Sequence, residues 1–277
     1  MVCLKIPNKV VFFRGSQIFE SEVNIIKEIE SEVGLKSTSR PDAFDMFVPL
    51  QFIAEDHRVK HITLHKYPFS TFPIAITKLK SIETINFSST ELESLPESIG
   101  NLVNLKMLAI DKGKLTNLPN SFKNLTTLKT LMLQDNKFTQ LPEVITELEM
   151  LKNLYVSSNQ LTSISDTIGK LKSLKELNLS WNKITSLPDS IGELSCLEML
   201  TLSKNQLSEL PESIGNLSSL KEIWLHENNL ESLPESILKL NSLQNLQIDG
   251  NPMLNNPNLK VERILEELRN KKVIIDY

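Results

Sequence analysis

The sequence has little cysteine and no long run of apolar residues. Only two cysteines, Cys3 and Cys196, occur among its 277 residues. So few cysteines are typical of a protein of the reducing cytoplasm, which is the location we predict. No segment approaches the roughly 18 apolar residues of a membrane span. Lys5, Asn8 and Lys9 interrupt the apolar residues near the N-terminus, so we expect no secretory signal and no membrane insertion.

Positive charge is not in excess either. The chain has 30 Lys and Arg against 34 Asp and Glu, a formal net charge of −4 and a pI near 5.7. A surface for nucleic acid or anionic lipid needs clustered lysine and arginine to neutralise phosphate. We therefore expect no nucleic-acid or membrane partner, and a protein or peptide remains the expected one.

Groupings of catalytic residues are also lacking. No G-x-x-x-x-G-K-[ST] run is present, and neither cysteine has a histidine nearby in sequence. Cys196 directly precedes the apolar Leu197, which favours a small buried side chain over a nucleophile. His57, His61 and His65 recur every four residues, a spacing of about 13 Å along a strand, which bonds of about 2 Å to one metal ion cannot bridge. We expect no enzyme activity, cofactor or metal site.

What the sequence does have is a repeat. From Leu174 it reads L-x-x-L-x-L-x-x-N-x-I-x-x-L-P-x-x-I-G-x-L and returns to leucine 23 residues later. The period has no insertion, so there are eight full repeats and a ninth half. The repeats start at Val59, Ile82, Leu105, Leu128, Leu151, Leu174, Leu197, Leu220 and Leu243.

This motif identifies the chain as a leucine-rich repeat protein, and its 23-residue form resembles the Ras-group repeats of Scribble, Erbin and the Ras-suppressor proteins. The resemblance covers about two thirds of the chain. It implies an α/β fold, a right-handed solenoid with a curved parallel sheet on the concave side and short helices or 3₁₀ turns on the convex side. It also implies a small GTPase, or a complex containing one, as a plausible partner.

Segments outside the repeat are predicted to cap the solenoid, because its ends would otherwise expose apolar core and an unpaired sheet edge. We assign residues 1–58 to an N-terminal cap, 59–251 to the repeats and 252–277 to a C-terminal cap. The first should hold a strand at 10–13, a helix at about 19–33, a loop at 35–49 and a hairpin of 51–54 with 59–64. The second should hold a helix from about 257 to 270 and a strand at 273–275.

Within a repeat, positions 3 to 7 should form a strand that directs positions 4 and 6 into the core and 3, 5 and 7 to solvent. The later S-x-x-E, with proline between, resembles a capping box that starts the convex turn. Ser165 replaces this proline in the fifth repeat, where we expect a less rigid start.

Asparagine at position 9 should turn inward and bind the backbone of neighbouring loops. In the first three repeats Tyr67, Thr90 and Gly113 stand there instead, and we expect less regular geometry. The structural asparagines are Asn136, Asn159, Asn182, Asn205, Asn228 and Asn251.

Large side chains at the predicted concave positions are the candidate binding residues. Exposed apolar patches are often partner sites, and Trp and Tyr are enriched in binding hot spots. The alternative is that these side chains only pack against their cross-strand neighbours. Acidic residues around them would favour a basic partner segment. The candidates are Met107, Met132, Tyr155, Glu176, Trp181, Met199, Glu222, Trp224 and His226.

Three functions fit these observations. The first is a non-catalytic cytoplasmic scaffold in signal transduction that binds a protein or peptide on its concave face. The second is the substrate-recognition subunit of a larger enzyme complex, such as a ubiquitin ligase. The third is a surface or secreted recognition protein.

Overall fold

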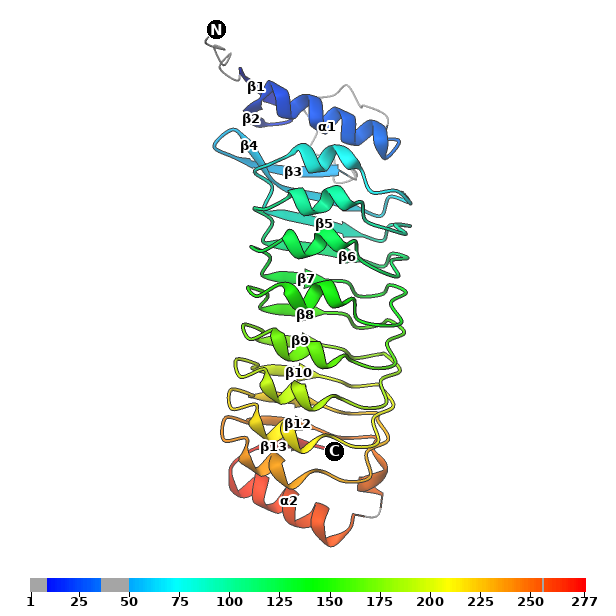
Figure 1. The fold of residues 1–277 in the computed structure, drawn as a ribbon, viewed down its shortest axis with the longest axis vertical. Coiled ribbons are helices and arrows are strands. Elements are labelled where there is room, and N and C mark those ends of the chain that lie inside the picture. The colour runs from blue at the N-terminus through cyan, green and yellow to red at the C-terminus, as the bar shows by residue number, and fades with distance from the viewer. Residues whose placement is uncertain (1–8, 36–49, 256) are drawn as a thin grey trace.

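The computed structural model describes residues 9–35, 50–255 and 257–277. The repeats stack along one long axis, with the strands in one column and the short helices in another (Figure 1). Helix α1 (Glu20–Glu32) covers one end of the stack and helix α2 (Leu259–Asn270) the other. The predicted leucine-rich repeat solenoid is confirmed.

One sheet runs through the whole stack. Its strands lie in chain order from β3 to β13, and within the described part of this sheet only the β3–β4 pair is antiparallel. The strands are β3 (Leu50–Glu55), β4 (Arg58–His65), β5 (Thr84–Ser88), β6 (Met107–Asp111), β7 (Thr130–Met132), β8 (Asn153–Tyr155), β9 (Glu176–Asn178), β10 (Met199–Thr201), β11 (Glu222–Trp224), β12 (Asn245–Gln247) and β13 (Ile274–Asp276). Each repeat strand pairs with the equivalent positions of the next strand, because every repeat has the same length and the register is therefore constant.

Strand length changes along the sheet in a way that was not predicted from the sequence. Strands β5 and β6 cover positions 3 to 7, as predicted, but β7 to β12 cover only positions 3 to 5. The short strands belong to repeats with asparagine at position 9, where the inward-turned amide binds the carbonyls at positions 6 and 7. Position 8 keeps the same left-handed backbone in the first three repeats, with φ of 51° at Lys66, 58° at Ser89 and 55° at Lys112. The first three repeats, where we expected less regular geometry, thus differ from the others in strand length but not in the backbone of the bend.

The other half of each repeat forms a five-residue 3₁₀ helix. A proline precedes it in seven repeats, with backbone φ near −70° that suits the start of a helix. These helices are η1 (Ile74–Lys78), η2 (Glu97–Asn101), η3 (Asn120–Asn124), η4 (Glu143–Glu147), η5 (Asp166–Lys170), η6 (Asp189–Glu193), η7 (Glu212–Asn216) and η8 (Glu235–Lys239), followed by the three-residue η9 (Pro252–Leu254).

The predicted capping box is not formed. Within residues 50–255, no serine side chain caps a 3₁₀ helix that a proline precedes, because the helix starts one residue after the proline and the serine lies too early. The glutamate instead reaches the next repeat: Glu97 Oε2 accepts from the backbone N–H of Ser121 at 2.9 Å. Ser165 does cap its helix, accepting from the N–H of Thr167 at 3.3 Å, so the fifth repeat replaces proline with a hydrogen bond.

The N-terminal cap holds one more strand than predicted. Strand β1 (Val10–Phe13) pairs antiparallel with β2 (Ser16–Phe19), and α1 follows at once. The turn between them needs left-handed residues, which Arg14 at φ 47° and Gly15 at φ 79° provide. Most of the predicted loop at 35–49 lies outside the described residues.

The core is a continuous apolar column inside the stack. Positions 1, 4, 6 and 11 are buried throughout, as at Leu174, Leu177, Leu179 and Ile184 of the sixth repeat. Burying each such side chain contributes about 1.5–3 kcal/mol. The core side chains of each repeat pack against those of the repeats before and after it. This packing holds the solvent-facing strand positions 3 and 5 at a fixed spacing from one repeat to the next.

Candidate protein-binding face

The solvent side of the sheet, formed by positions 3, 5 and 7, is called here the sheet face. A diagonal strip of five predicted site residues crosses it from β7 to β11. Met132 pairs with Tyr155 across β7 and β8, and Met199 lies between Glu176 and Glu222 on β9 to β11. All five side chains are half-buried. The strip is continuous, because Tyr155 also contacts Glu176.

The contact between Tyr155 and Glu176 joins the apolar and acidic halves of the strip. The Tyr155 hydroxyl donates to Oε2 of Glu176. Burial, and then this hydrogen bond, raise the pKa of Tyr155 to about 12. The phenol therefore remains a hydrogen-bond donor at neutral pH and fixes the position of the Glu176 side chain on the sheet face.

Trp224 lies apart from this strip. It pairs with Thr201 of β10 and Gln247 of β12, so Asn178 and Thr201 separate it from Tyr155 along position 5. None of the close aromatic ring pairs in the described residues joins Tyr155, Trp181 or Trp224. The three aromatic side chains among the candidate binding residues therefore lie apart from one another.

His226 contacts the neighbouring repeat. Its Nδ1 lies 2.8 Å from Oγ of the buried Ser203, at the equivalent position of the seventh repeat. His226 is half-buried, and this contact holds its ring against the seventh repeat. Met107 lies on β6, the strand next to the start of the strip, where it pairs with Thr130 at position 3 of β7.

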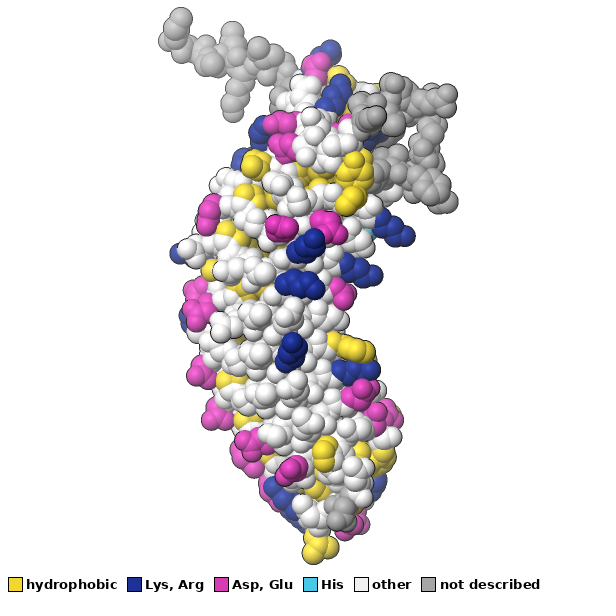
Figure 2. All heavy atoms as spheres, turned by 90° about the vertical axis from the view of Figure 1, so that its right-hand side faces the viewer, with side chains coloured by type: hydrophobic (Ala, Val, Ile, Leu, Met, Phe, Trp, Pro, Cys, Tyr) yellow, Lys and Arg dark blue, Asp and Glu magenta, His cyan; other side chains and the backbone are white. Residues whose placement is uncertain are grey.

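Trp181 lies just beyond the sheet face, at position 8, where the chain bends. It is 57% exposed and its φ is 58°, a conformation that bulky side chains rarely adopt. The Lys204 Nζ lies 3.9 Å from the centre of its ring, and Glu227 Oε1 lies 3.0 Å from the same nitrogen. Figure 2 shows acidic and basic side chains interspersed along the length of the side that it views.

The six asparagines at position 9 are buried beneath the bend. In the sixth repeat, Asn182 Oδ1 accepts from the N–H of Leu161 at 2.9 Å. Its Nδ2 donates to the carbonyls of Val156 and Leu179, both at 3.0 Å. One amide thus connects two repeats, and Asn136, Asn159, Asn205, Asn228 and Asn251 repeat the pattern.

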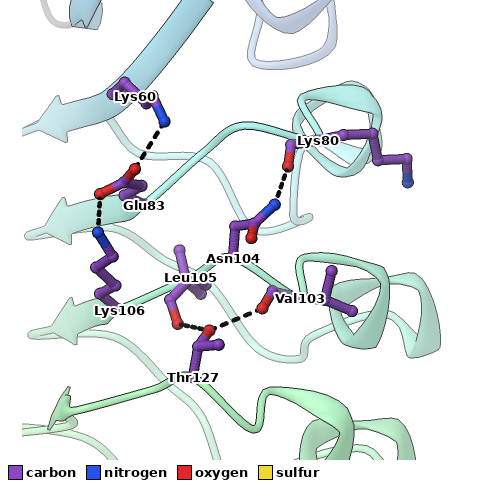
Figure 3. A network of polar contacts seen from close by, with 8 residues as sticks. All are labelled: Lys60, Lys80, Glu83, Val103, Asn104, Leu105, Lys106 and Thr127. Carbon is purple, nitrogen blue, oxygen red and sulfur yellow. Dashed lines mark hydrogen bonds and ion pairs between the residues drawn. The ribbon is translucent and has the colours of Figure 1, made fainter. Parts of the chain in front are cut away.

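A column of charges at position 2, along the edge where the repeat strands begin, was not predicted from the sequence. Glu83 Oε1 lies 2.7 Å from Nζ of Lys60, and its other oxygen lies 2.5 Å from Nζ of Lys106 (Figure 3). Glu198 bridges Lys175 and Lys221 in the same way, at 2.7 and 2.6 Å. These pairs lower the pKa of both glutamates to about 2. The signal was present in the sequence, since a lysine follows the first residue of six repeats.

The remaining candidates for chemistry lie apart from one another. Cys196 is exposed, contrary to the prediction, because it occupies the turn before β10 rather than a core position. His57 lies in the turn between β3 and β4, whereas His61 and His65 are on β4. Within the described residues, no group of three potential ligands could hold a metal ion, and no helix is long and apolar enough to span a membrane.

Comparison with solved structures shows the same architecture elsewhere. A leucine-rich repeat protein of Leptospira interrogans is 36% identical, with a TM-score of 0.61, over 76% of this chain and 58% of that one. The plant peptide hormone receptor RGFR1 in complex with RGF2 is 26% identical, with a TM-score of 0.52, over 65% of this chain and 34% of that one. The chain thus spans little more than half of the first and a third of the second.

The leucine-rich repeat ectodomain of the Arabidopsis thaliana receptor kinase GASSHO1/SCHENGEN3, solved with CASPARIAN STRIP INTEGRITY FACTOR 2, shares the fold. It is 22% identical, with a TM-score of 0.65, over 82% of this chain and 32% of that one. No curated protein matches the sequence. A family model described as a leucine-rich repeat region matches residues 47–154, 98–182, 123–204 and 164–275. The chain belongs to the leucine-rich repeat proteins.

Proposed function

We propose that this chain is a non-catalytic interaction module that binds a protein or an extended peptide on its sheet face. The observation that carries the proposal is the continuous strip from Met132 through Tyr155 to Glu222. It combines apolar contact area with fixed carboxylates. Such a surface suits a partner with apolar and basic side chains. One similar solved structure is a peptide hormone receptor in complex with RGF2, which supports a peptide-sized partner.

Trp224 at position 5 and Trp181 at position 8 would extend this surface from the strip toward the ends of the strands. Position 8 is left-handed in every repeat, so the backbone does not single out Trp181; its large exposed ring supports a partner contact. The small-GTPase link, the role in signal transduction and the cytoplasmic location belong to the same proposal, and they follow from the Ras-group resemblance and the scarcity of cysteine.

The test is capture of partners from lysate of the source cells by the whole chain and by a Tyr155→Ala, Trp181→Ala, Trp224→Ala triple variant. The matched control is Ile74→Ala, Val103→Ala, Met150→Ala, which removes three exposed apolar side chains off the sheet face. We expect a partner that the control retains and the triple variant loses. Equal capture by both would place binding elsewhere.

The finer parts of the proposal need separate measurements. Purified small GTPases, loaded with GDP or a GTP analogue, would be titrated against the immobilised chain. Cell fractionation would test the location, and recovery in the extracellular or membrane fraction would contradict it.

A further inference from the structure

The charge column at position 2 is unbalanced in its middle. From the first repeat to the ninth it reads Lys60, Glu83, Lys106, Lys129, Lys152, Lys175, Glu198, Lys221 and Gln244. Each glutamate offsets part of the positive charge of the two lysines beside it. Between Glu83 and Glu198, however, four lysines follow one another. This lysine edge comprises Lys106, Lys129, Lys152 and Lys175, and all four side chains are exposed.

The backbone holds these lysines close together. The N–H of Lys129 donates to the carbonyl of Lys106 at 2.8 Å, and the same bond joins Lys152 to Lys129 at 2.8 Å. Neighbouring strands lie about 4.8 Å apart, so the side chains of successive lysines begin close together. At this spacing their like charges repel. Lys106 and Lys175 are each engaged by a glutamate. In the described part of the chain, no carboxylate lies within 4 Å of Nζ of Lys129 or Lys152.

The column itself shows how the repulsion could be relieved. A glutamate at position 2 bridges the lysines above and below it, as Figure 3 shows for Glu83. The two central repeats lack one, although the chain as a whole has more acidic than basic residues. A column that keeps unneutralised lysines at its centre is therefore complementary to carboxylates brought by another molecule.

We propose that the lysine edge binds an acidic segment of a partner protein, whose carboxylates lie over Lys129 and Lys152. The four lysines span three strand spacings, about 14 Å, which four to five residues of extended chain would cover. Alternate residues of such a chain face one side, so two or three acidic side chains would meet the edge. This inference rests on the proposed function and deepens it: the partner would present basic and apolar groups to the strip and acidic groups to the edge.

A defined probe tests the inference. A fluorescein-labelled peptide of alternating glutamate and serine, seven residues long, would be titrated against the whole chain and followed by fluorescence anisotropy at low salt. The test variant is Lys129→Gln with Lys152→Gln. The control is Lys137→Gln with Lys183→Gln, which removes two exposed lysines from the bends after the strands. We expect roughly tenfold weaker binding for the test variant, since two contacts are lost, and unchanged binding for the control.

Other outcomes would overturn it. They are no binding of the peptide by the wild type, or equal loss in both variants. A further one is binding of phosphatidylserine vesicles or oligouridine in preference to the peptide, because the occupant would then be lipid or nucleic acid. The Tyr155→Ala, Trp181→Ala, Trp224→Ala variant should keep the peptide. The two proposals therefore fail separately. If the triple variant keeps the partner from lysate, the sheet-face proposal fails; if the lysine variant keeps the peptide, the lysine-edge proposal fails.

A second variant tests the premise in the folded protein. Lys152→Glu would build a further glutamate bridge, between Lys129 and Lys175. We expect a melting temperature about 1–3 °C higher than wild type at low salt, together with loss of the peptide. A lower melting temperature would show that the lysines do not repel one another, and would overturn the proposal.

Discussion

The indole ring of Trp181 lies against the ammonium group of Lys204, with 3.9 Å between Nζ and the ring centre. This contact contributes about 0.5–1 kcal/mol at an exposed site. Trp181 also has a left-handed backbone, with φ of 58°. That conformation costs roughly 1–2 kcal/mol for residues other than glycine. The side chain is therefore held at a position that favours glycine, which the ninth repeat has at Gly250.

The strain at Trp181 predicts an order of stability among its variants. Trp181→Gly should keep stability close to wild type, because it loses the lysine contact but also the backbone cost. Trp181→Val should be less stable than Trp181→Gly by about 1–2 kcal/mol, since a β-branched side chain fits this backbone worst. Urea unfolding of both variants measures the difference. Equal midpoints would show that position 8 is not left-handed in solution.

The asparagine at position 9 predicts a second stability effect. Asn182→Ala leaves the buried N–H of Leu161 and two carbonyls without their partner. We expect a loss of about 1–3 kcal/mol in the free energy of unfolding. Asn229→Ala removes an exposed asparagine one position further along its repeat and should change little. Equal effects of the two substitutions would contradict the connecting role of the buried amide.

The repeat was readable from sequence because its period never varies. A 23-residue spacing fixes every strand register in advance, so burial of Leu177 and Leu179 follows from alternation alone. The prediction for Cys196 was wrong because it relied on an apolar neighbour instead: Leu197 is buried, but Cys196 is exposed. Adjacent residues in a turn face different ways, and apolar neighbours in sequence do not determine burial there.

The site was harder to predict than the fold, because it depends on contacts between repeats. The sequence places Tyr155 and Glu176 on the sheet face, but their hydrogen bond depends on which rotamers meet across β8 and β9. Tyr155 and Trp224 both occupy position 5, but they lie on β8 and β11, and the strands β9 and β10 separate them. The column at position 2 is found only when the repeats are aligned and the same position is compared in all of them, since each lysine alone is an ordinary surface residue.

Neighbouring 3₁₀ helices η7 and η8 lie so close together at Gly215 that we expect only glycine to fit there. A Cβ on Gly215 would lie 2.4 Å from the carbonyl oxygen and 2.6 Å from Cβ of Ser236 in the next repeat. Gly215→Ala should therefore force the repeats apart and cost about 1–3 kcal/mol. Gly169→Ala is the matched control, because its nearest atoms lie 3.0 Å away. Thermal unfolding should rank Gly215→Ala below Gly169→Ala, and the reverse order would contradict this packing.

The carboxyl of Asp111 predicts how stability depends on pH. Burial raises its pKa to about 6 from an ordinary value of 3.8, and its Oδ1 has no hydrogen-bond partner in the described residues. The backbone N–H of Gln134 and the charge of Lys112 oppose this shift, while the charge of Asp135 adds to it. Because the folded state binds this proton more tightly than the unfolded state, the contribution is greatest below pH 3.8 and is lost as pH rises to 6.

Asp111→Asn should remove this loss. The variant is expected to gain stability relative to wild type as pH rises from 4 to 7, by about 1–3 kcal/mol over the whole window. Urea unfolding at pH 4, 5, 6 and 7 measures the gain. Asp189→Asn, at an exposed carboxyl on η6, serves as the control and should show no such trend. A constant difference between Asp111→Asn and wild type would mean that Asp111 titrates alike in both states, and that its carboxyl is solvated on the sheet face.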